Sequence, residues 1–218
     1  QIEGVQFLKE NYGALLADEP GLGKTIQTIV ALKILFSTKK VSRALLVVPK
    51  STIGDGKKSA RTKIPIQWEG HLELWAPELK YWTINRDDSS RGDWWKSFQR
   101  DRTLDYKKEA QIFLVTYDQL RGDIKNKAFP MDYFDLIVLD EIHNIKNPNS
   151  QRSMYLKKLE AKYKWGLSGT PVQNAPKDLY AIYEFLKPEQ FPSLSATQYE
   201  MLTEKEVIKK TKKYILRR

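Results

Sequence analysis

The chain has 218 residues, which suits one domain with a sizeable core and is short for two ordinary domains. Its composition, 41% hydrophobic and 29% charged, excludes collagen-like, disordered and membrane-spanning classes, since no apolar run approaches the roughly 18 residues of a bilayer span. The absence of cysteine excludes disulfides and cysteine-ligated metals, and two histidines are too few for a histidine cluster. We expect an intracellular protein with no membrane partner, nuclear if eukaryotic and otherwise cytoplasmic.

The net charge of +10 is concentrated in two segments. Residues 50–63 contain five basic residues and one acidic residue, and residues 201–218 contain seven basic and two acidic residues. Such segments favour a polyanion such as nucleic acid as partner. Solvated loop and tail charges are the alternative that charge alone leaves open.

Short apolar runs alternate with amphipathic stretches along the chain. The runs predict buried strands at residues 14–17, 44–48, 112–116, 136–140 and 165–168. The stretches between them predict helices at residues 24–36, 67–75, 153–159 and 178–185. This alternation predicts an α/β domain with a mainly parallel sheet and helices on both faces. Ligands of such sheets bind at the carboxyl ends of the strands.

Three segments depart from this alternation. Residues 53–66 and 85–105 are polar and are expected to be insertions, the second with a packing cluster of its own around Trp94, Trp95 and Phe98. After Pro188 the strand pattern stops, and residues 200–218 are expected to form a basic helix or strap that leads out of the domain.

The first motif that carries chemistry is DEPGLGKT, from Asp18 to Thr25, between an expected strand and an expected helix. Gly21 and Gly23 let backbone N–H groups turn toward a phosphate, and the helix N-terminus adds a partial positive charge. Lys24 would reach the β- and γ-phosphates, and the Thr25 hydroxyl would bind Mg²⁺. Asp18 stands where the general phosphate-loop pattern has its first glycine, so a structural turn is the alternative for this motif taken alone.

The second motif is a carboxylate pair, Asp140 and Glu141, at the end of the strand expected at residues 136–140. Asp140 beside a phosphate loop could hold Mg²⁺ through its water shell, and Glu141 could act as general base on the attacking water. A solvated Asp-Glu pair is the alternative, but the preceding DEPGLGKT motif favours the catalytic interpretation.

These motifs, with LSGTPVQN at residues 167–174, resemble the SWI/SNF-type DNA-dependent ATPases of helicase superfamily two. Other stretches are also similar to that family: the opening QIEGVQFL, ALLVVPKS at 44–51, VTYD at 115–118, IKNPNSQRS at 145–153 and FLKPEQF at 185–191. The motif sequences DEIHNIKNP and KWGLSGTPVQN most resemble those of the repair-associated branch of the family. Pro20 and Ile142 replace the family's usual methionine and alanine, and because neither is a catalytic group we expect both to be tolerated.

The resemblance implies a RecA-like, ATP-binding first lobe over residues 1–190 and a basic linker over residues 191–218 toward a second lobe. The family's second lobe supplies arginines that complete the ATP site. Such arginines are worth about 10³–10⁵ in turnover, so this chain alone is expected to bind nucleotide and to hydrolyse it poorly.

The resemblance also implies a role for each matched position in the nucleotide site. Gln1 would recognise adenine, and the phosphates would be wrapped by Asp18, Glu19, Pro20, Gly21, Leu22, Gly23, Lys24 and Thr25. Thr25 and Asp140 would hold Mg²⁺, and the catalytic set would be Lys24, Asp140 and Glu141. His143 would couple this site to Ser168, Gly169 and Thr170, although a core histidine is the alternative.

Contacts with nucleic acid are implied at Lys50, Ser51, Thr116, Tyr117, Gln173 and Asn174. They would touch phosphate and sugar, which gives affinity without sequence choice. Strand-end packing is the alternative for Thr116 and Tyr117. Core packing is expected, rather than base stacking, for Trp68, Trp75, Trp94 and Trp95.

The leading hypothesis is the ATP-binding lobe of a Mg²⁺-dependent double-stranded-DNA translocase that remodels chromatin or complexes of DNA with another protein. A strand-separating RNA or DNA helicase and a non-hydrolysing nucleotide-gated scaffold are the alternatives.

Overall fold

The computed structural model describes residues 1–53, 67–84, 91–96, 111–169 and 176–218. Within these ranges seven strands form one sheet in the order β3-β4-β2-β5-β6-β1-β7, and every neighbouring pair is parallel. The strands are β1 (Gly13–Leu16), β2 (Ala44–Val48), β3 (Tyr81–Thr83), β4 (Ile112–Thr116), β5 (Leu136–Leu139), β6 (Tyr163–Leu167) and β7 (Ile215–Leu216). The predicted parallel α/β sheet is therefore confirmed.

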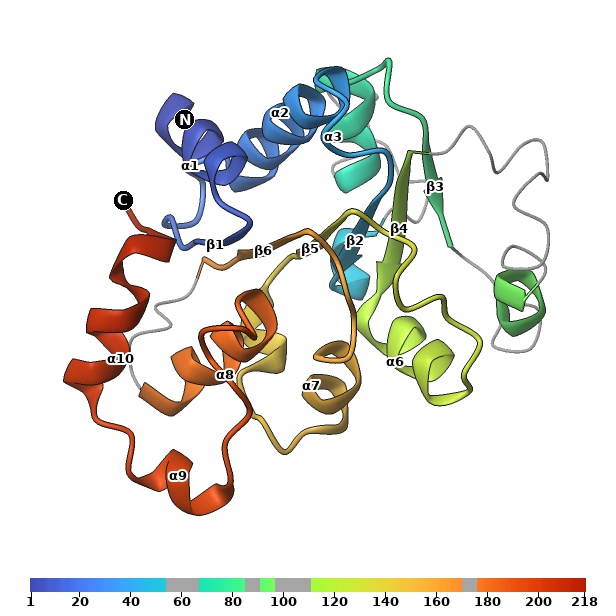
Figure 1. Cartoon of the computed structure of the whole chain (residues 1–218). Helices are drawn as coiled ribbons and strands as arrows, with labels where there is room; N and C mark the ends of the chain where they lie inside the picture. Colours follow the sequence, from blue (N-terminus) through green and yellow to red (C-terminus); the bar gives the residue numbers. More distant parts are fainter. Residues whose placement is uncertain (54–66, 85–90, 97–110, 170–175) are drawn as a thin grey trace.

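Helices cover both faces of the sheet, as Figure 1 shows. One face carries α1 (Ile2–Glu10), α2 (Lys24–Ser37) and α3 (Trp68–Trp75), and the other carries α6 (Tyr117–Lys125), α7 (Gln151–Leu156) and α8 (Pro176–Leu186). Two shorter helices follow α8 along the chain, α9 (Ala196–Glu200) and α10 (Glu204–Thr211). Within the described ranges, no helix combines the length and apolar character needed to cross a membrane.

The strands are apolar without alternation because both faces of the sheet are buried. In β2, Leu46 and Val48 pack with α2 and α3, while Leu45 and Val47 pack in the opposite layer. All five residues of β2 are fully buried. The hydrophobic effect therefore holds each central strand from two sides.

The predicted elements are present with small shifts at their ends. The fifth strand begins at Tyr163, and the helix expected at residues 153–159 is α7, which begins at Gln151 because Ser150 caps its first turn. Helices α1 and α6 and the two edge strands, β3 and β7, were not predicted from the sequence. These edge strands are only three and two residues long, too short to give an apolar pattern of their own.

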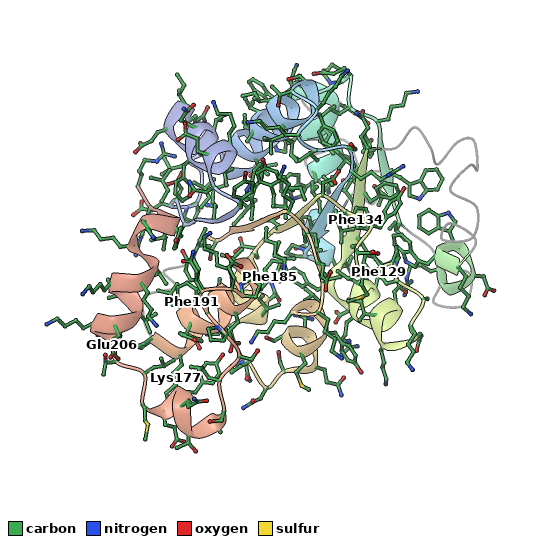
Figure 2. All side chains as sticks on the ribbon, in the orientation of Figure 1. Phe129, Phe134, Lys177, Phe185, Phe191 and Glu206 are labelled. Carbon is green, nitrogen blue, oxygen red and sulfur yellow. The ribbon has the colours of Figure 1, made fainter. Side chains whose placement is uncertain are left out.

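The separate packing cluster expected within residues 85–105 is wrong for the part that the structure describes. Trp94 and Trp95 belong to the main core, where the centroid of the Trp95 ring lies 4.7 Å from that of Phe129 and 6.4 Å from that of Phe134. Figure 2 labels these two phenylalanines. Aromatic burial against the sheet explains this, since both indoles are almost fully buried. Phe98 and most of both expected insertions lie outside the described residues.

The prediction that the strand pattern stops after Pro188 and that residues 200–218 lead out of the domain is also wrong. Helix α10 packs against α8 through Val207, and β7 returns to the sheet beside β1. The pairing joins Leu15 to Ile215 and Leu16 to Leu216. Burial of Val207 and Tyr214 ties this basic segment to the lobe, so the lobe continues to the end of the described chain.

A test of this packing uses two glycines. A Cβ atom at Gly13 would lie 2.3 Å from the backbone oxygen of Leu186, whereas one at Gly92 would lie 3.9 Å from its nearest neighbour, the Ala128 Cβ. We expect Gly13→Ala to lower the free energy of unfolding by about 1–3 kcal/mol, because β1 and α8 must separate. The control Gly92→Ala should leave it within about 1 kcal/mol of the unsubstituted chain. Urea denaturation measures both, and equal effects would contradict the packing described here.

Candidate nucleotide site

The loop after β1 has the backbone of a phosphate-binding loop. Gly21 and Gly23 have φ angles of 87° and 75°, in the left-handed region that favours glycine. Gly23 is the N-cap of α2, a helix of 14 residues. A Cβ at Gly23 would lie 2.6 Å from Gln1 Nε2, so the expected adenine-reading residue lies against this loop. Left-handed glycines before a helix N-terminus direct backbone N–H groups toward one point, which favours the binding of an anion.

Lys24 bends back across the loop from the first residue of α2. Its Nζ donates hydrogen bonds to the carbonyl oxygens of Asp18 at 2.7 Å and Glu19 at 3.0 Å. Thr25 follows in the same first turn of the helix. The side chain that would neutralise phosphates and the hydroxyl that would bind Mg²⁺ therefore stand together at the helix N-terminus.

Asp18 is a fully buried carboxylate at the start of this loop. Arg218 Nη2 lies 2.6 Å from Asp18 Oδ2, and Gln27 Nε2 lies 3.3 Å from the same oxygen. Sequence reasoning missed Arg218 as part of this site, because it is 200 residues away from Asp18 and no local pattern connects them. The structure thus explains how a carboxylate is tolerated at the position of the pattern's first glycine.

The acidic pair follows β5 and is held by elements from both helical layers. Trp68 Nε1, from α3, donates to Asp140 Oδ2 at 2.8 Å, and the Glu141 N–H donates to Asp140 Oδ1 at 3.0 Å. Tyr117, from α6, donates its hydroxyl to the backbone oxygen of Asp140 at 2.7 Å. Burial raises the pKa of Asp140, while the Trp68 hydrogen bond and the nearby Lys24 charge act in the opposite direction.

Glu141 is one of the few non-glycine residues with a left-handed backbone, at φ 51°. Its Oε2 lies 3.2 Å from Nδ1 of His143, and its backbone oxygen accepts from Asn144 Nδ2 at 2.9 Å. A left-handed residue of this kind is a local strain that the surrounding contacts must hold. The result is a sharp turn that places Glu141 and His143 next to each other directly after Asp140.

The expected coupling segment lies between the two motifs. Strand β6 is flanked by β5 and β1, so the end of β6 separates the acidic pair from the phosphate loop. Ser168 donates its N–H to the Leu16 oxygen at 3.1 Å, and a Cβ at Gly169 would lie 3.3 Å from Pro20 Cγ and 3.5 Å from Lys24 Nζ. Gly169 is therefore in contact with the loop. Thr170 lies outside the described residues, and coupling through His143 stays a prediction.

Several of the expected nucleic-acid positions line one hollow of about 520 Å³ at the same edge of the sheet. Lys50 and Ser51 lie in a 3-10 turn after β2, and Thr116 ends β4 and caps α6. Lys50 and Thr116 line the hollow, as does Arg152, which sequence reasoning did not single out. Asp118 also lines it and is ion-paired with Arg152 at 2.9 Å, which leaves Lys50 as the uncompensated positive charge among the lining residues for a phosphate partner. Gln173 and Asn174 lie outside the described residues.

Tyr117 also borders this hollow, but its side chain is 3% exposed. Its hydroxyl is engaged by Asp140, and Arg152 lies over its ring at 5.5 Å. The structure therefore gives Tyr117 the interior packing that was the alternative to a nucleic-acid contact. Of the four tryptophans expected in the core, Trp68, Trp94 and Trp95 are buried, whereas Trp75 is 43% exposed and is a correction to that expectation.

The residues at this edge fit Mg²⁺ in the way that nucleotide sites bind it. Within the described ranges, no group of three or more Asp, Glu or His side chains is placed so that it could hold a metal ion by itself. Mg²⁺ commonly uses one or two protein oxygens together with waters and substrate phosphates. Each Asp140 carboxylate oxygen accepts one of the hydrogen bonds above and keeps a lone pair, so Asp140 and Thr25 could supply that small set of oxygens.

A phosphate loop before α2 and a partly buried carboxylate after β5 define a P-loop nucleotide-binding domain. The whole chain, residues 1–218, matches the SNF2-related domain family. The chain therefore belongs to the SNF2-related family.

Solved structures and curated relatives agree with this assignment. The SWI2/SNF2 ATPase core of Sulfolobus solfataricus in complex with dsDNA is 29% identical, with a TM-score of 0.72 over 100% of this chain and 43% of that chain. Its RecA-like α/β fold is the fold found here. A second structure, of the Sulfolobus solfataricus SWI2/SNF2 ATPase core domain, is 27% identical with a TM-score of 0.70 over 100% of this chain and 42% of that chain.

Among curated relatives, an ATP-dependent helicase of Mycoplasma genitalium is 30% identical over 100% of this chain, and the CHD3-type chromatin-remodeling factor CHR7 of Arabidopsis thaliana is 32% identical over 91% of it. Human chromodomain-helicase-DNA-binding protein 1 is 32% identical over 88% of it. This chain spans 20%, 16% and 11% of those three proteins. None of these names refers to DNA repair, so the repair-associated branch stays a prediction.

The bond from Trp68 to Asp140 gives a prediction about pH. Because this bond lowers the pKa of Asp140, Trp68→Phe should raise that pKa. A protonated Asp140 cannot hold a cation, so the loss of Mg²⁺-dependent ADP binding on the acid side should move to higher pH, by up to about one pH unit. Calorimetric titration of ADP with Mg²⁺ between pH 5 and pH 8 would measure the shift.

Trp165→Phe is the matched control, since it removes an indole N–H that donates to the Asn11 oxygen on the same helical face but away from the acidic pair. Its pH profile should coincide with that of the unsubstituted chain. An equal shift in both variants would contradict a specific effect on Asp140.

Proposed function

We propose that this chain is the ATP-binding first lobe of a motor that uses ATP to move along double-stranded DNA and remodels chromatin or other DNA–protein complexes. The observation that carries the proposal is the meeting of three segments at one sheet edge: the phosphate loop after β1, the acidic pair after β5 and Gly169 between them. This is the arrangement that a nucleotide-driven switch needs, because the γ-phosphate would lie beside all three.

Within the nucleotide site, each residue would have one task. Gln1 would hydrogen-bond the adenine, the loop amides from Gly21 to Thr25 would hold the phosphates, and Lys24 would neutralise them. Mg²⁺, when bound, would offset the charge that builds on the phosphates in the transition state. Glu141 would take the proton of the attacking water, and its neighbour His143 would orient it.

The nucleic-acid side of the proposal rests on the hollow beside β2 and β4. Lys50 gives it positive charge, Arg152 lies there in an ion pair with Asp118, and Tyr117 connects it to the backbone of Asp140. A shift in the acidic pair on hydrolysis would therefore reach this hollow through one hydrogen bond. The Sulfolobus structure in complex with dsDNA and the chromatin-remodelling relatives support duplex DNA as the polymer.

A second RecA-like lobe belongs to the proposal. It would close over the phosphate loop and add arginines to the transition state, which accounts for the slow turnover expected of this chain alone. The proposed location is intracellular, nuclear in a eukaryote and cytoplasmic otherwise.

The first test is steady-state ATP hydrolysis by the protein with both lobes, without polymer and with duplex DNA, single-stranded DNA or RNA. We expect stimulation by duplex DNA. Glu141→Gln should keep ADP affinity and lower turnover by about 10²–10⁴, because it removes the base and keeps the shape of the side chain. Lys24→Ala should lose both binding and turnover, since the phosphates lose their cation.

The other outcomes separate the alternatives. Stimulation by single strands or RNA alone would favour a strand-separating helicase. Nucleotide binding without turnover under any condition would favour a nucleotide-gated scaffold.

The second test concerns the phosphate contacts and uses lysines at opposite ends of β2. Lys50 follows the strand at the site edge, and the exposed Lys40 precedes it at the other edge. We expect Lys50→Ala to weaken the binding of duplex DNA by the same factor whatever the DNA sequence. The slope of log K for DNA binding against log salt concentration should become less steep by about one. Lys40→Ala should leave the slope unchanged. Fluorescence anisotropy over a range of KCl concentrations measures it, and identical slopes for both variants would argue against the proposed track.

A further inference from the structure

The buried carboxylate of Asp18 has a partner from the far end of the chain. Three groups of Arg218 bond it: the backbone N–H at 3.1 Å, Nε at 3.2 Å and Nη2 at 2.6 Å. Gln27 joins the same cluster, giving a bond to Asp18 and receiving one from Arg218 Nη2 at 2.8 Å. These bonds to Asp18 raise the pKa of Arg218, so the guanidinium stays charged at every working pH.

The main chain on both sides of Asp18 is bonded by the same segment. Ala17 donates its N–H to the Leu216 oxygen at 2.7 Å, and Glu19 donates to the Arg218 oxygen at 3.2 Å. Strand β7 and Arg218 thus fix the first residues of the phosphate loop through backbone as well as side chain. The two residues whose carbonyl oxygens bind Lys24, Asp18 and Glu19, are those held by Arg218.

Charge gives this contact a consequence for ligand binding. A bound di- or triphosphate would bring several negative charges to the loop that Asp18 begins, and a buried carboxylate is weakly screened by solvent. Without a cation beside it, Asp18 would repel the phosphates and would itself be costly to bury. Arg218 supplies that cation, with Nη2 2.6 Å from Asp18 Oδ2.

Arg218 is also exposed enough to meet a ligand. Its side chain is 28% accessible, and with Gln1, Gly21 and Leu22 it lines a hollow of about 220 Å³ beside the phosphate loop. Gln1 is the expected adenine-reading residue, so this hollow is where the nucleoside end of the nucleotide would begin. Glu3 on α1 holds the other side of the guanidinium, at 3.3 Å from Nη1.

We propose that Arg218 is a positioning residue of the nucleotide site: it cancels the charge of Asp18, fixes the start of the phosphate loop and forms one wall of the hollow for the nucleoside. This inference rests on the proposed function, since it concerns the same nucleotide.

The test measures the affinity of the chain for a fluorescent ADP with Mg²⁺. Arg218→Ala should raise Kd about tenfold or more, because it leaves Asp18 as an unpaired charge beside the phosphates. Arg218→Lys should fall between, since an ammonium cannot reproduce the bonds from Nε and Nη2 together. Arg217→Ala is the matched control, an exposed arginine one position earlier, and should stay within about twofold.

A second comparison, between Asp18→Asn and the double variant Asp18→Asn/Arg218→Ala, tests the proposal even if Arg218→Ala does not fold. Asp18→Asn and the double variant Asp18→Asn/Arg218→Ala both lack the buried carboxylate, so neither leaves an unpaired negative charge. Where Arg218→Ala does fold, charge cancellation predicts that the double variant binds ADP more tightly than Arg218→Ala does. If Arg218 forms a wall of the nucleoside hollow, the double variant should bind adenosine more weakly than Asp18→Asn does, by about threefold or more. Thermal unfolding of each variant sets a temperature at which all are folded.

The outcomes are separable. If Arg218→Ala binds ADP as well as Arg217→Ala does, or the double variant binds adenosine as well as Asp18→Asn does, the role of Arg218 is overturned while the proposed function stands. If the unsubstituted chain binds no ADP, the proposed function is overturned and the inference falls with it.

Discussion

All strand pairs in the sheet are parallel, and the site depends on this constraint. Parallel strands bring their carboxyl ends to one edge, so segments far apart in sequence meet there. Strand order then decides which segments are neighbours: β6 separates β5 from β1, and Gly169 therefore lies between the acidic pair and the phosphate loop. Burial of both sheet faces by helices makes this edge rigid enough to hold close polar contacts.

Two carboxylates stand at this edge, Asp18 fully buried and Asp140 partly buried, and each is compensated in a different way. Asp18 is neutralised by Arg218. Asp140 is held by neutral donors, Trp68 and its own neighbour's N–H, and burial raises its pKa. The difference suits their tasks: Asp18 must not repel phosphates, whereas Asp140 keeps carboxylate lone pairs for a cation. Contacts from α3 and α6 converge on Asp140, so a change there would be felt in both helical layers.

The sequence was sufficient for the five central strands and for the loop and acidic motifs, because these are local patterns of apolar runs, glycines and charges. It was insufficient where the structure depends on long-range pairing. The bonds of Asp18 with Arg218 and of Trp68 with Asp140 span 200 and 72 residues and have no local signal. Strand β7 is two residues long, so its pairing with β1 is set by position rather than by pattern. The exposed or interior position of an aromatic residue such as Tyr117 likewise depends on the packed fold.

The central claim, that this edge of the sheet binds a nucleotide with Mg²⁺, is tested most directly by a crystal structure of the chain with ADP and Mg²⁺. We predict that the phosphates lie on the backbone N–H groups from Gly21 to Thr25 and that the metal is bound near Thr25 and Asp140. Lys24 Nζ should have moved from the carbonyl oxygens of Asp18 and Glu19 to a phosphate oxygen. A nucleotide bound elsewhere, or bound here with Lys24 still on those carbonyl oxygens and no metal near Asp140, would contradict it.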